Sequence, residues 1–310
     1  MTALDVVGLG YAALDTIGLT PRLPHLDDNV LLEDLTRQGG GPVAQALVTL
    51  VRLGASAGFV GRIGDDDAGT LIRAGLAEEG VDVTYLQTAP AARSLQSMIL
   101  VDKETGKRSI CAFRGTAGPI ELDDATLAYL SSGTYLHLDG HSPEAAVAAA
   151  RETSRRGARV CLDAGAGTTL EHLLPIIRVT DVLVAAERFA ISAAPDGEMT
   201  SGAAYLRSLG PEIVVVTQGE HGSYTLAGDT AFSTPAFRVP VVDTTGAGDV
   251  FHGAYLYGLL QGWDLAATAA FAGATAALKC TQLGGRVAIP RLPQVLAFME
   301  EHGSKLPMAR

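Results

Sequence analysis

Short apolar runs alternate with longer, alanine-rich amphipathic stretches along most of the chain. The runs are apolar at consecutive positions, which is typical of strands buried on both faces. Alternating strands and helices predict an α/β fold with a mainly parallel central sheet covered by helices on both faces. The predicted strands are 6–7, 57–60, 134–138, 159–162, 182–184 and 213–216, and the predicted helices are about 43–53, 67–79, 123–131, 143–156, 168–177, 187–194, 199–208, 250–261, 265–279 and 292–301.

Two segments, about 13–36 and 94–114, depart from this alternation because their apolar residues recur at every second position. In the second segment, two strand-like runs flank a turn over 102–107, where Gly106 supplies the positive φ that a hairpin turn needs. We therefore expect a single domain, 1–310, into which a small antiparallel β-flap is inserted. Such a flap leaves one face to be covered, so it is a candidate lid or dimer contact.

Composition narrows the class of protein. The chain has 310 residues, 47% of them hydrophobic, and lacks an apolar run of about eighteen residues, so we expect a soluble protein with a large core. It carries 23 basic and 34 acidic residues, a net charge of −11, and the basic residues are scattered. We therefore expect no nucleic acid and no membrane as partners.

Two further expectations concern the compartment and the thiols. The start of the chain lacks the basic and apolar regions of a secretory signal, which predicts a cytoplasmic protein. Cys111, Cys161 and Cys280 are widely spaced in apolar surroundings, which predicts buried free thiols.

The most informative motif is the run over 243–249, Asp-Thr-Thr-Gly-Ala-Gly-Asp, which leads into the predicted helix from Val250. Its glycines let the backbone approach an anion closely, and the unpaired N–H groups and dipole of the following helix favour negative charge there. Asp249 would stand beside that anion as a base. The run therefore predicts a phosphate cradle with a carboxylate next to it.

Other glycine-rich runs are less specific. The run over 8–13 fits G-x-G-x-x-A, but an alternating segment with two prolines follows where a dinucleotide fold needs a helix. Gly106 and Lys107 lack the rest of a P-loop. The run 39–42, Gly-Gly-Gly-Pro, is either an ordinary helix start or a backbone surface for a polyol. The acids at 65–67 are expected to cap the next helix.

Segments 39–66 and 243–253 resemble the two signatures of the ribokinase-like (PfkB) carbohydrate kinases, in the expected order and about 200 residues apart. Residues 217–222 also match, and the resemblance covers about 5–300. It implies a three-layer α/β/α ribokinase-like fold with a β-flap as lid. It further implies an ATP-dependent, Mg²⁺-requiring kinase that phosphorylates a hydroxyl of a sugar or sugar-like substrate, with a ketose or sugar acid favoured.

The resemblance also implies roles for single residues. Asp249 matches the general base, and Asp15 matches the acid that holds substrate hydroxyls. Asp243 matches an acid that in some relatives holds a monovalent cation such as K⁺, here with carbonyls near Lys279, Gln282 and Gly284; capping its own turn is the alternative role. The other matches are an anion hole at Gly246, Ala247 and Gly248, nucleotide contacts at Thr217, Gly219, Gly222 and Gly284, and substrate contacts at Gly39, Gly40 and Gly41.

The chain departs from the family pattern at two positions. A sugar-binding asparagine is replaced by Ala44, and the usual Asn-x-x-Glu is replaced by 186–189, Ala-Glu-Arg-Phe. Glu187 either supports Mg²⁺ through water or pairs at a helix start. These changes leave the matched base and anion hole intact, so they bear on which substrate is bound and not on the reaction.

Details near these motifs resemble the ketose-kinase side of the family, which includes sulfofructose kinases; His252 is one of them. However, an arginine and a lysine expected to hold a sulfonate are replaced by Gly140 and Asn29, so a sulfosugar is not predicted. Asn29 and Arg114 are within reach of the flap, where each either contacts an acidic or ketose substrate or has a purely structural role.

Two alternatives stay open. A nucleoside kinase on the same fold would require aromatic residues in the flap, yet aromatics make up only 5% of the chain. A nucleotide-binding regulator that has lost catalysis would explain the missing Asn-x-x-Glu. The resemblance also implies a homodimer formed through the lid.

Overall fold

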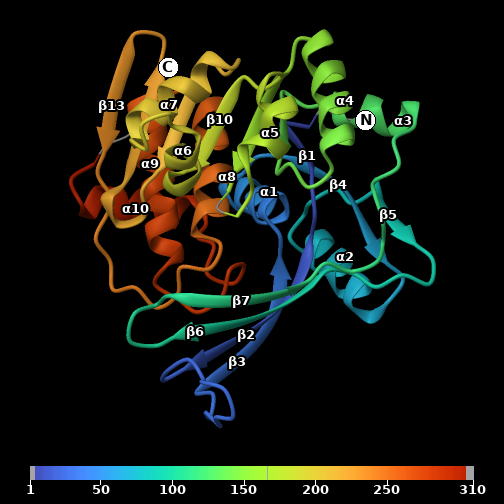
Figure 1. The fold of residues 1–310 in the computed structure, drawn as a ribbon, viewed down its shortest axis with the longest axis vertical. Coiled ribbons are helices and arrows are strands. Elements are labelled where there is room, and N and C mark those ends of the chain that lie inside the picture. Colours follow the sequence, from blue (N-terminus) through green and yellow to red (C-terminus); the bar gives the residue numbers. More distant parts are fainter. Residues whose placement is uncertain (1–3, 166, 305–310) are drawn as a thin grey trace.

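The computed structural model describes residues 4–165 and 167–304. Its main sheet has nine strands, which are β1 (Val6–Leu9), β4 (Ala57–Gly64), β5 (Leu86–Ala89), β8 (Tyr135–Leu138), β9 (Arg159–Ala164), β10 (Val182–Ala186), β11 (Ile213–Thr217), β12 (Ser223–Ala227) and β13 (Thr230–Thr234). Their order across the sheet is β13-β12-β11-β10-β9-β8-β1-β4-β5. The pairs from β11 to β5 are parallel, and β12 and β13 add an antiparallel edge (Figure 1). The predicted mainly parallel sheet is therefore present.

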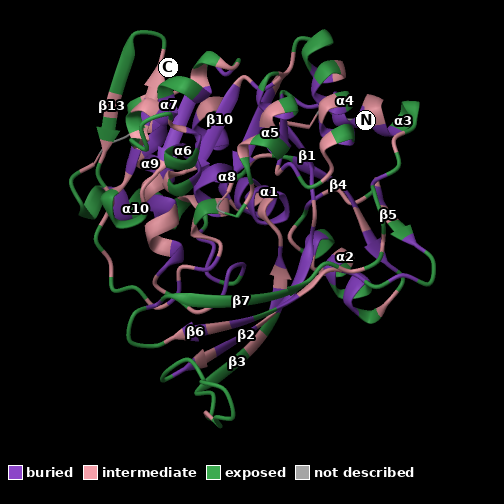
Figure 2. Cartoon of the chain, viewed as in Figure 1, coloured by how far each residue is buried: buried purple, intermediate pink, exposed green. Residues whose placement is uncertain are grey.

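Helices cover both faces of this sheet. Neighbouring residues of each strand point to opposite sides, so each strand contributes apolar side chains to both faces. Val215 belongs to one apolar cluster with α1, α2 and α8–α10, while Val214 belongs to a second cluster with α3–α7. Figure 2 shows the central strands as almost wholly buried. The helices are α1 (Pro42–Leu53), α2 (Asp67–Glu78), α3 (Asp124–Leu130), α4 (Pro143–Arg155), α5 (Leu170–Ile177), α6 (Glu187–Ala193), α7 (Met199–Ser208), α8 (Ala247–Leu260), α9 (Leu265–Lys279) and α10 (Leu292–Glu301), with a 3₁₀ turn η1 (Gly219–His221).

A second sheet of four strands forms the lid. Its strands are β2 (Ala13–Thr20), β3 (Asp34–Gly40), β6 (Gln96–Asp102) and β7 (Arg108–Phe113), in the order β3-β2-β6-β7. Two antiparallel pairs are joined through a parallel β2–β6 pair, so the predicted flap is present but is mixed at its centre. Figure 1 shows it projecting from one edge of the body.

The lid lies at the carboxyl edge of the parallel strands. β1 ends at Leu9 and the chain enters β2 at Ala13, so no helix intervenes and the dinucleotide-binding interpretation of 8–13 is excluded by the structure. Carboxyl edges of parallel sheets are where ligands bind in such folds. The strand ends and the lid therefore lie at the same edge of the main sheet.

Several elements differ from their predicted form. β3 continues to Gly40, beyond the expected lid boundary at 36, so the three-glycine run is partly strand. β5, β12 and β13 were not predicted, because they are short and only partly buried. The expectation of three buried thiols is wrong for Cys111: it is exposed, because no residue of β7 is buried.

Other local expectations are confirmed. Asp66 caps α2 by accepting the N–H of Gly69 at 2.9 Å, as the acids at 65–67 predicted. Cys161 and Cys280 are buried free thiols. Within the described residues, no helix has the length and apolarity needed to cross a bilayer.

Candidate active site

The residues that end the parallel strands lie along one edge of the main sheet. Thr217 ends β11, Glu187 follows β10, Asp163 is the last residue but one of β9, and Asp139 follows β8. Adjacent strands are about 4.8 Å apart, so the edge from β11 to β8 spans about 15 Å. This row extends from the expected nucleotide loop to the lid.

The turn over 243–249 has the geometry of an anion-binding helix start. Gly246 is the N-cap of α8 and has φ 74°, a left-handed conformation that glycine adopts without strain. The N–H of Ala247 donates to the Thr244 carbonyl at 3.2 Å and closes the turn. The N–H groups of Gly248 and Asp249 belong to the first turn of α8, where a helix has no carbonyl of its own to offer. These two N–H groups are therefore better placed than that of Ala247 to donate hydrogen bonds to an anion.

The side chain of Asp243 holds this turn through hydrogen bonds to backbone N–H groups. Its side chain is fully buried. One carboxylate oxygen accepts the N–H of Thr245 at 2.7 Å and the other accepts the N–H of Gly284 at 2.8 Å. The acid thus joins the phosphate turn to the loop after α9.

Asp249 is half-buried in the first turn of α8. Burial raises the pKa of its carboxyl to about 6, while the charges of Arg108 and Lys279 lower it. Arg108, on β7 of the lid, donates from Nη1 to Thr244 Oγ1 at 3.0 Å. Lys279, at the end of α9, donates from Nζ to the Asp243 carbonyl at 2.8 Å. Two cations from different elements therefore flank the turn.

Three more carboxylates face the same space as Asp249. Burial raises the pKa of Asp15 to about 6 and that of Asp139 to about 7, and it raises that of Asp163 well above its usual range. In each case the negative charge of Asp249 raises the pKa further. Four carboxylates at one sheet edge repel one another when all are ionised. Nearby cations or hydroxyl donors are needed to stabilise that state.

Tyr11 stands among these acids. Burial raises the pKa of its hydroxyl strongly, and the four carboxylates add to that effect. Its ring centroid lies 4.9 Å from that of His141. Asp139 accepts the backbone N–H groups of Tyr11 at 3.0 Å and His141 at 2.9 Å. Sequence reasoning missed Tyr11, Asp139 and Asp163, although the pairs Leu-Asp at the ends of apolar runs were a visible signal.

The three-glycine run is fixed by close contacts. A Cβ at Gly40 would overlap the Asp15 carboxylate, and one at Gly39 would overlap the Arg286 guanidinium. Gly41 has φ 100° and lies against the Tyr11 carbonyl. Glycine is required here by space as well as by backbone conformation, and Asp15 lies directly beside the run.

Ala44 is buried, and the next residue, Gln45, is also buried and contacts the phosphate turn and Arg286. Its side-chain nitrogen would lie 3.6 Å from a Cβ at Gly246, and its Oε1 accepts Nε of Arg286 at 3.0 Å. The loop over 283–286, which contains the predicted nucleotide contact Gly284, therefore packs against the start of α1.

The predicted nucleotide loop follows β11. Gly219 and Gly222 have φ values of 57° and 97°, and the N–H of Gln218 donates to the Gly222 carbonyl at 2.8 Å. Glu187 Oε1 accepts Nε2 of Gln218 at 2.9 Å. A carboxylate thus lies against this loop, which fits a magnesium ion held through water. No cluster of three acidic, histidine or cysteine side chains able to bind a metal directly occurs among residues 4–165 and 167–304.

The remaining residues singled out by the sequence differ in exposure. Asn29 is exposed in the connection between β2 and β3, where its N–H donates to the Asp28 side chain at 2.8 Å. Arg114 is exposed just after β7, and its charge adds to the burial that lowers the pKa of His141. The charge of Arg114 therefore acts on His141, whereas the hydrogen bond of Asn29 stays within its own turn. His252 is buried, with Nε2 3.6 Å from Asp163 Oδ1.

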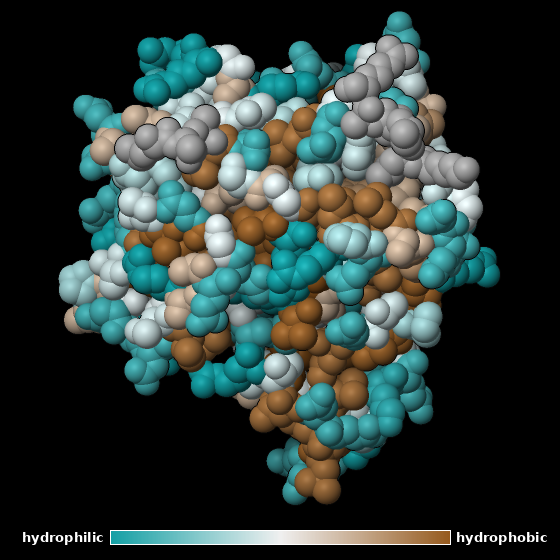
Figure 3. All heavy atoms as spheres, turned by 180° about the vertical axis from the view of Figure 1, so that it is seen from behind, coloured by the Kyte–Doolittle hydropathy of each residue, from teal (hydrophilic) through white to brown (hydrophobic). Residues whose placement is uncertain are grey.

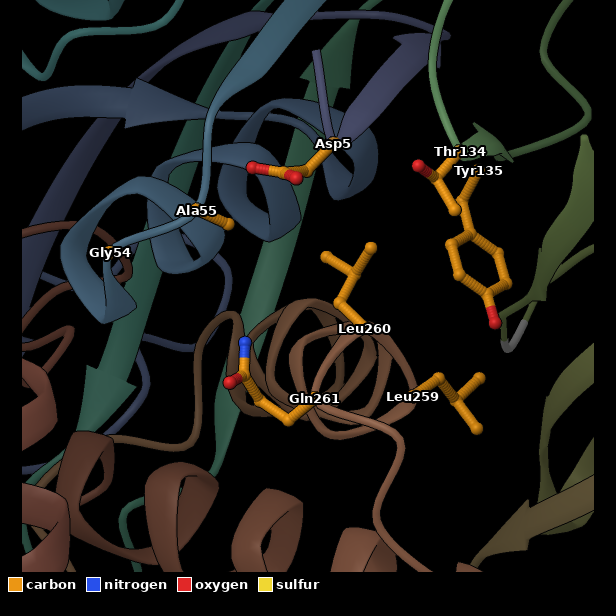
Figure 4. Close-up of a pocket in the computed structure, with 8 residues that line it drawn as sticks. All are labelled: Asp5, Gly54, Ala55, Thr134, Tyr135, Leu259, Leu260 and Gln261. Atoms are coloured by element: carbon orange, nitrogen blue, oxygen red, sulfur yellow. The ribbon is translucent and has the colours of Figure 1, made fainter. Parts of the chain in front are cut away.

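A separate cavity of about 290 Å³ lies at the opposite edge of the sheet. Asp5 precedes β1 and Thr134 precedes β8, and the end of α8 at Leu259 to Gln261 closes the space (Figure 4). None of these residues belongs to the carboxylate cluster. The cavity is distinct from the candidate active site.

The fold and this site define a phosphotransferase-like α/β protein in which a small second sheet and a cluster of carboxylates lie at the carboxyl edge of the main sheet. Residues 3–292 match the pfkB family carbohydrate kinases. The chain belongs to this family and is a phosphotransferase that uses an alcohol group as acceptor.

Curated relatives cover nearly the whole chain. An ATP-dependent ribose-1-phosphate kinase of Halopiger xanaduensis is 28% identical, over 96% of this chain and 98% of that protein. A 5-dehydro-2-deoxygluconokinase of Shouchella clausii is 28% identical, over 96% of each. An aminoimidazole riboside kinase of Salmonella typhimurium is 30% identical, over 85% of this chain and 88% of that protein.

Solved structures agree on the fold. A putative ribokinase from Agrobacterium tumefaciens is 26% identical, with a TM-score of 0.89 over 98% of this chain and all (100%) of that one. A putative ribokinase II of E. coli, solved with ATP and Mg²⁺, is 21% identical, with a TM-score of 0.83 over 96% of this chain and 100% of that one. The predicted ribokinase-like fold is confirmed.

Proposed function

We propose that this protein transfers the γ-phosphoryl group of ATP to a hydroxyl of a sugar-like substrate, with Asp249 as the general base. The observation that carries the proposal is the placement of one half-buried carboxylate in the first turn of α8. It lies beside the backbone amides of the same turn. Its negative charge raises the pKa of Asp15, near the start of β2 in the lid.

The mechanism follows from that placement. With a pKa of about 6, Asp249 is mostly ionised near neutral pH and still accepts a proton readily as the hydroxyl attacks. The first-turn amides of α8 stabilise the charge that spreads over the transferring group. Arg108 and Lys279 add positive charge on either side of the same turn.

The nucleotide is placed along the row of strand ends. The loop over 217–222 would hold the ATP phosphates through Thr217, Gly219 and Gly222, with the base near Gly284. Glu187 would support Mg²⁺ through water from its position against Gln218. When bound, the metal would neutralise charge on the phosphates.

The substrate end favours a sugar with several hydroxyls or an acid group. The buried carboxylate of Asp15 and the half-buried side chains of Asp139 and Tyr11 offer oxygens to substrate hydroxyls, and Asp15 lies directly beside Gly40. Arg114 places a positive charge near His141. A ketose or sugar acid is consistent with this lining and with the relative named for 5-dehydro-2-deoxygluconate.

A nucleoside kinase is the second candidate. The Tyr11–His141 ring pair at the cleft could stack on a base, and a relative with 30% identity is named for a riboside. The two candidates differ in the size of the acceptor that the cleft accommodates.

A panel of acceptors separates these candidates. Purified protein is incubated with [γ-³²P]ATP and Mg²⁺ against ketoses, ketogluconates, sulfosugars and nucleosides, and ATP binding is measured in parallel by calorimetry. Transfer to a sugar or sugar acid supports the proposal, and preferential transfer to a nucleoside supports the second candidate. ATP binding without transfer to any acceptor would instead indicate a nucleotide-binding regulator.

The lid also suggests an assembly. Its outer face carries exposed apolar side chains at Leu35 and Met98, and Figure 3 shows hydrophobic side chains gathered over the projecting part of the molecule. Monomeric proteins rarely leave such a sheet face uncovered. We include a homodimer formed through the lid in the proposal.

A further inference from the structure

A buried ammonium lies directly under the phosphate-binding turn. The side chain of Lys279 is fully buried, and its Nζ donates to the backbone carbonyl of Asp243 at 2.8 Å. A charged group without solvent is costly unless it is paired by nearby acceptors and opposite charges. The charges of Asp243 and Asp249 act on this ammonium and oppose the effect of burial on its pKa.

The same position was expected to hold K⁺, but the oxygens of Asp243 and Cys280 there already accept hydrogen bonds. Both carboxylate oxygens of Asp243 accept backbone N–H groups, from Thr245 and Gly284, and its carbonyl accepts Lys279. The neighbouring carbonyl of Cys280 accepts the N–H groups of Val242 at 2.8 Å and Asp243 at 3.2 Å. A monovalent cation needs several free oxygens, and the Lys279 ammonium already occupies the Asp243 carbonyl, so Asp243 and Cys280 do not offer such a set.

We propose that the ammonium of Lys279 is a built-in replacement for the monovalent cation and makes phosphoryl transfer by this enzyme independent of K⁺. This proposal rests on the proposed function of the 243–249 turn. Lys279 acts as a positioning residue: it fixes the Asp243 carbonyl and places positive charge behind the amides of α8. Its position in the last turn of α9 is also where the helix dipole favours a cation.

The replacement is covalent, so its charge does not depend on the ionic composition of the solvent. A bound K⁺ would leave the site when its concentration falls, whereas Lys279 stays in place as long as the protein is folded. The turn is therefore pre-organised for an anion before ATP arrives.

The first test uses the wild-type protein and whichever acceptor the panel identifies. Transfer rates are measured in choline, Na⁺ and K⁺ chlorides at constant ionic strength, and ADP affinity is measured in the same buffers by calorimetry. We expect both quantities to be unchanged by K⁺. Stimulation of the rate, or tightening of ADP binding, by K⁺ and not by Na⁺ would overturn the proposal.

The second test uses two variants. Lys279→Ala opens space for an ion, whereas Lys279→Met fills the space with an apolar chain of similar length. We expect both to lose about tenfold or more in kcat in choline, with Lys279→Ala regaining activity and ADP affinity in K⁺ or NH₄⁺ and Lys279→Met regaining neither. Wild-type kcat for both variants in choline would contradict the proposal.

A matched control separates charge from packing. Thr275 is buried one turn earlier on α9 and donates to the Phe271 carbonyl at 2.8 Å. Thr275→Ala should lower stability without creating any response to K⁺. If the Lys279 variants do not fold, the wild-type cation series still decides the question. A wild-type protein that transfers no phosphate defeats the proposed function, while the ADP-affinity series still tests Lys279.

Discussion

At the scale of single residues, the substrate side of the site depends on glycines that leave space for a carboxylate. Asp15 lies so close to Gly40 that no side chain larger than hydrogen fits between them. The carboxylate is buried, and burial raises its pKa to about 6 against the opposing effect of a hydrogen bond with Ser97. Position and protonation of Asp15 are therefore sensitive to any atom added at Gly40.

Gly40→Ala tests this packing. Because the added methyl group must push Asp15 away, we expect KM for the acceptor to rise by about tenfold or more while ATP affinity changes little. Gly273→Ala is the control: a Cβ there meets no atom within 4 Å, and alanine stabilises a helix by about 0.5–1 kcal/mol relative to glycine. Steady-state kinetics and thermal melts decide, and an unchanged KM in Gly40→Ala would contradict the placement of Asp15.

At the scale of elements, the lid hairpin is attached to the phosphate turn. The N–H of Thr244 donates to the Gly106 carbonyl at 3.3 Å, and Arg108 reaches the Thr244 hydroxyl. A lid element thus contributes a charge to Asp249, which belongs to the body. The ionisation of Asp249 therefore depends on a charge that the lid carries.

Arg108→Ala should reveal that dependence. Arg108 lowers the pKa of Asp249, so its removal raises that pKa, and more Asp249 is protonated at a given pH. We expect the acidic limb of the kcat/KM profile to move to higher pH by up to about one unit, with a smaller shift at high salt. Lys103→Ala is the control, because Lys103 pairs with Glu33 at 2.6 Å on the exposed lid. A shift in both variants, or in neither, would contradict this dependence.

Elements also show how far the sequence reaches. Runs that are apolar on both faces, such as 213–216, predicted the parallel strands, and period-two segments predicted the lid. The hairpin of β12 and β13 was missed because it is half-exposed and short. Arg108 and Lys279 were missed as charges at the site because they lie about 140 and 30 residues from Asp249 in sequence, and only the folded chain brings them together.

At the scale of the whole molecule, each of the two sheets contributes different residues to the site. The buried main sheet fixes the row from Thr217 to Asp139, and the lid supplies Asp15 and Arg108. The exposed outer face of the lid then suggests that a second copy covers it. Assembly and closure would act on the same element.

Met98→Asp tests the assembly. Met98 is 67% exposed on the outer face of β6, and a charge there would be desolvated in a dimer. We expect a dimer for the wild-type protein and a monomer for the variant in light scattering coupled to size exclusion. Leu296→Asp, on the exposed side of α10, should remain dimeric. A monomeric wild-type protein at all concentrations would remove the lid dimer from the account.

The central claim is that Asp249 accepts the proton of the attacking hydroxyl. It is tested by the single-turnover rate of Asp249→Asn with Mg²⁺, ATP and the acceptor found in the panel, alongside ATP affinity by calorimetry. An amide keeps the shape and loses the base, so we predict a rate lower by about 10²–10⁴-fold with ATP affinity retained. A variant that transfers phosphate at the wild-type rate would contradict the account.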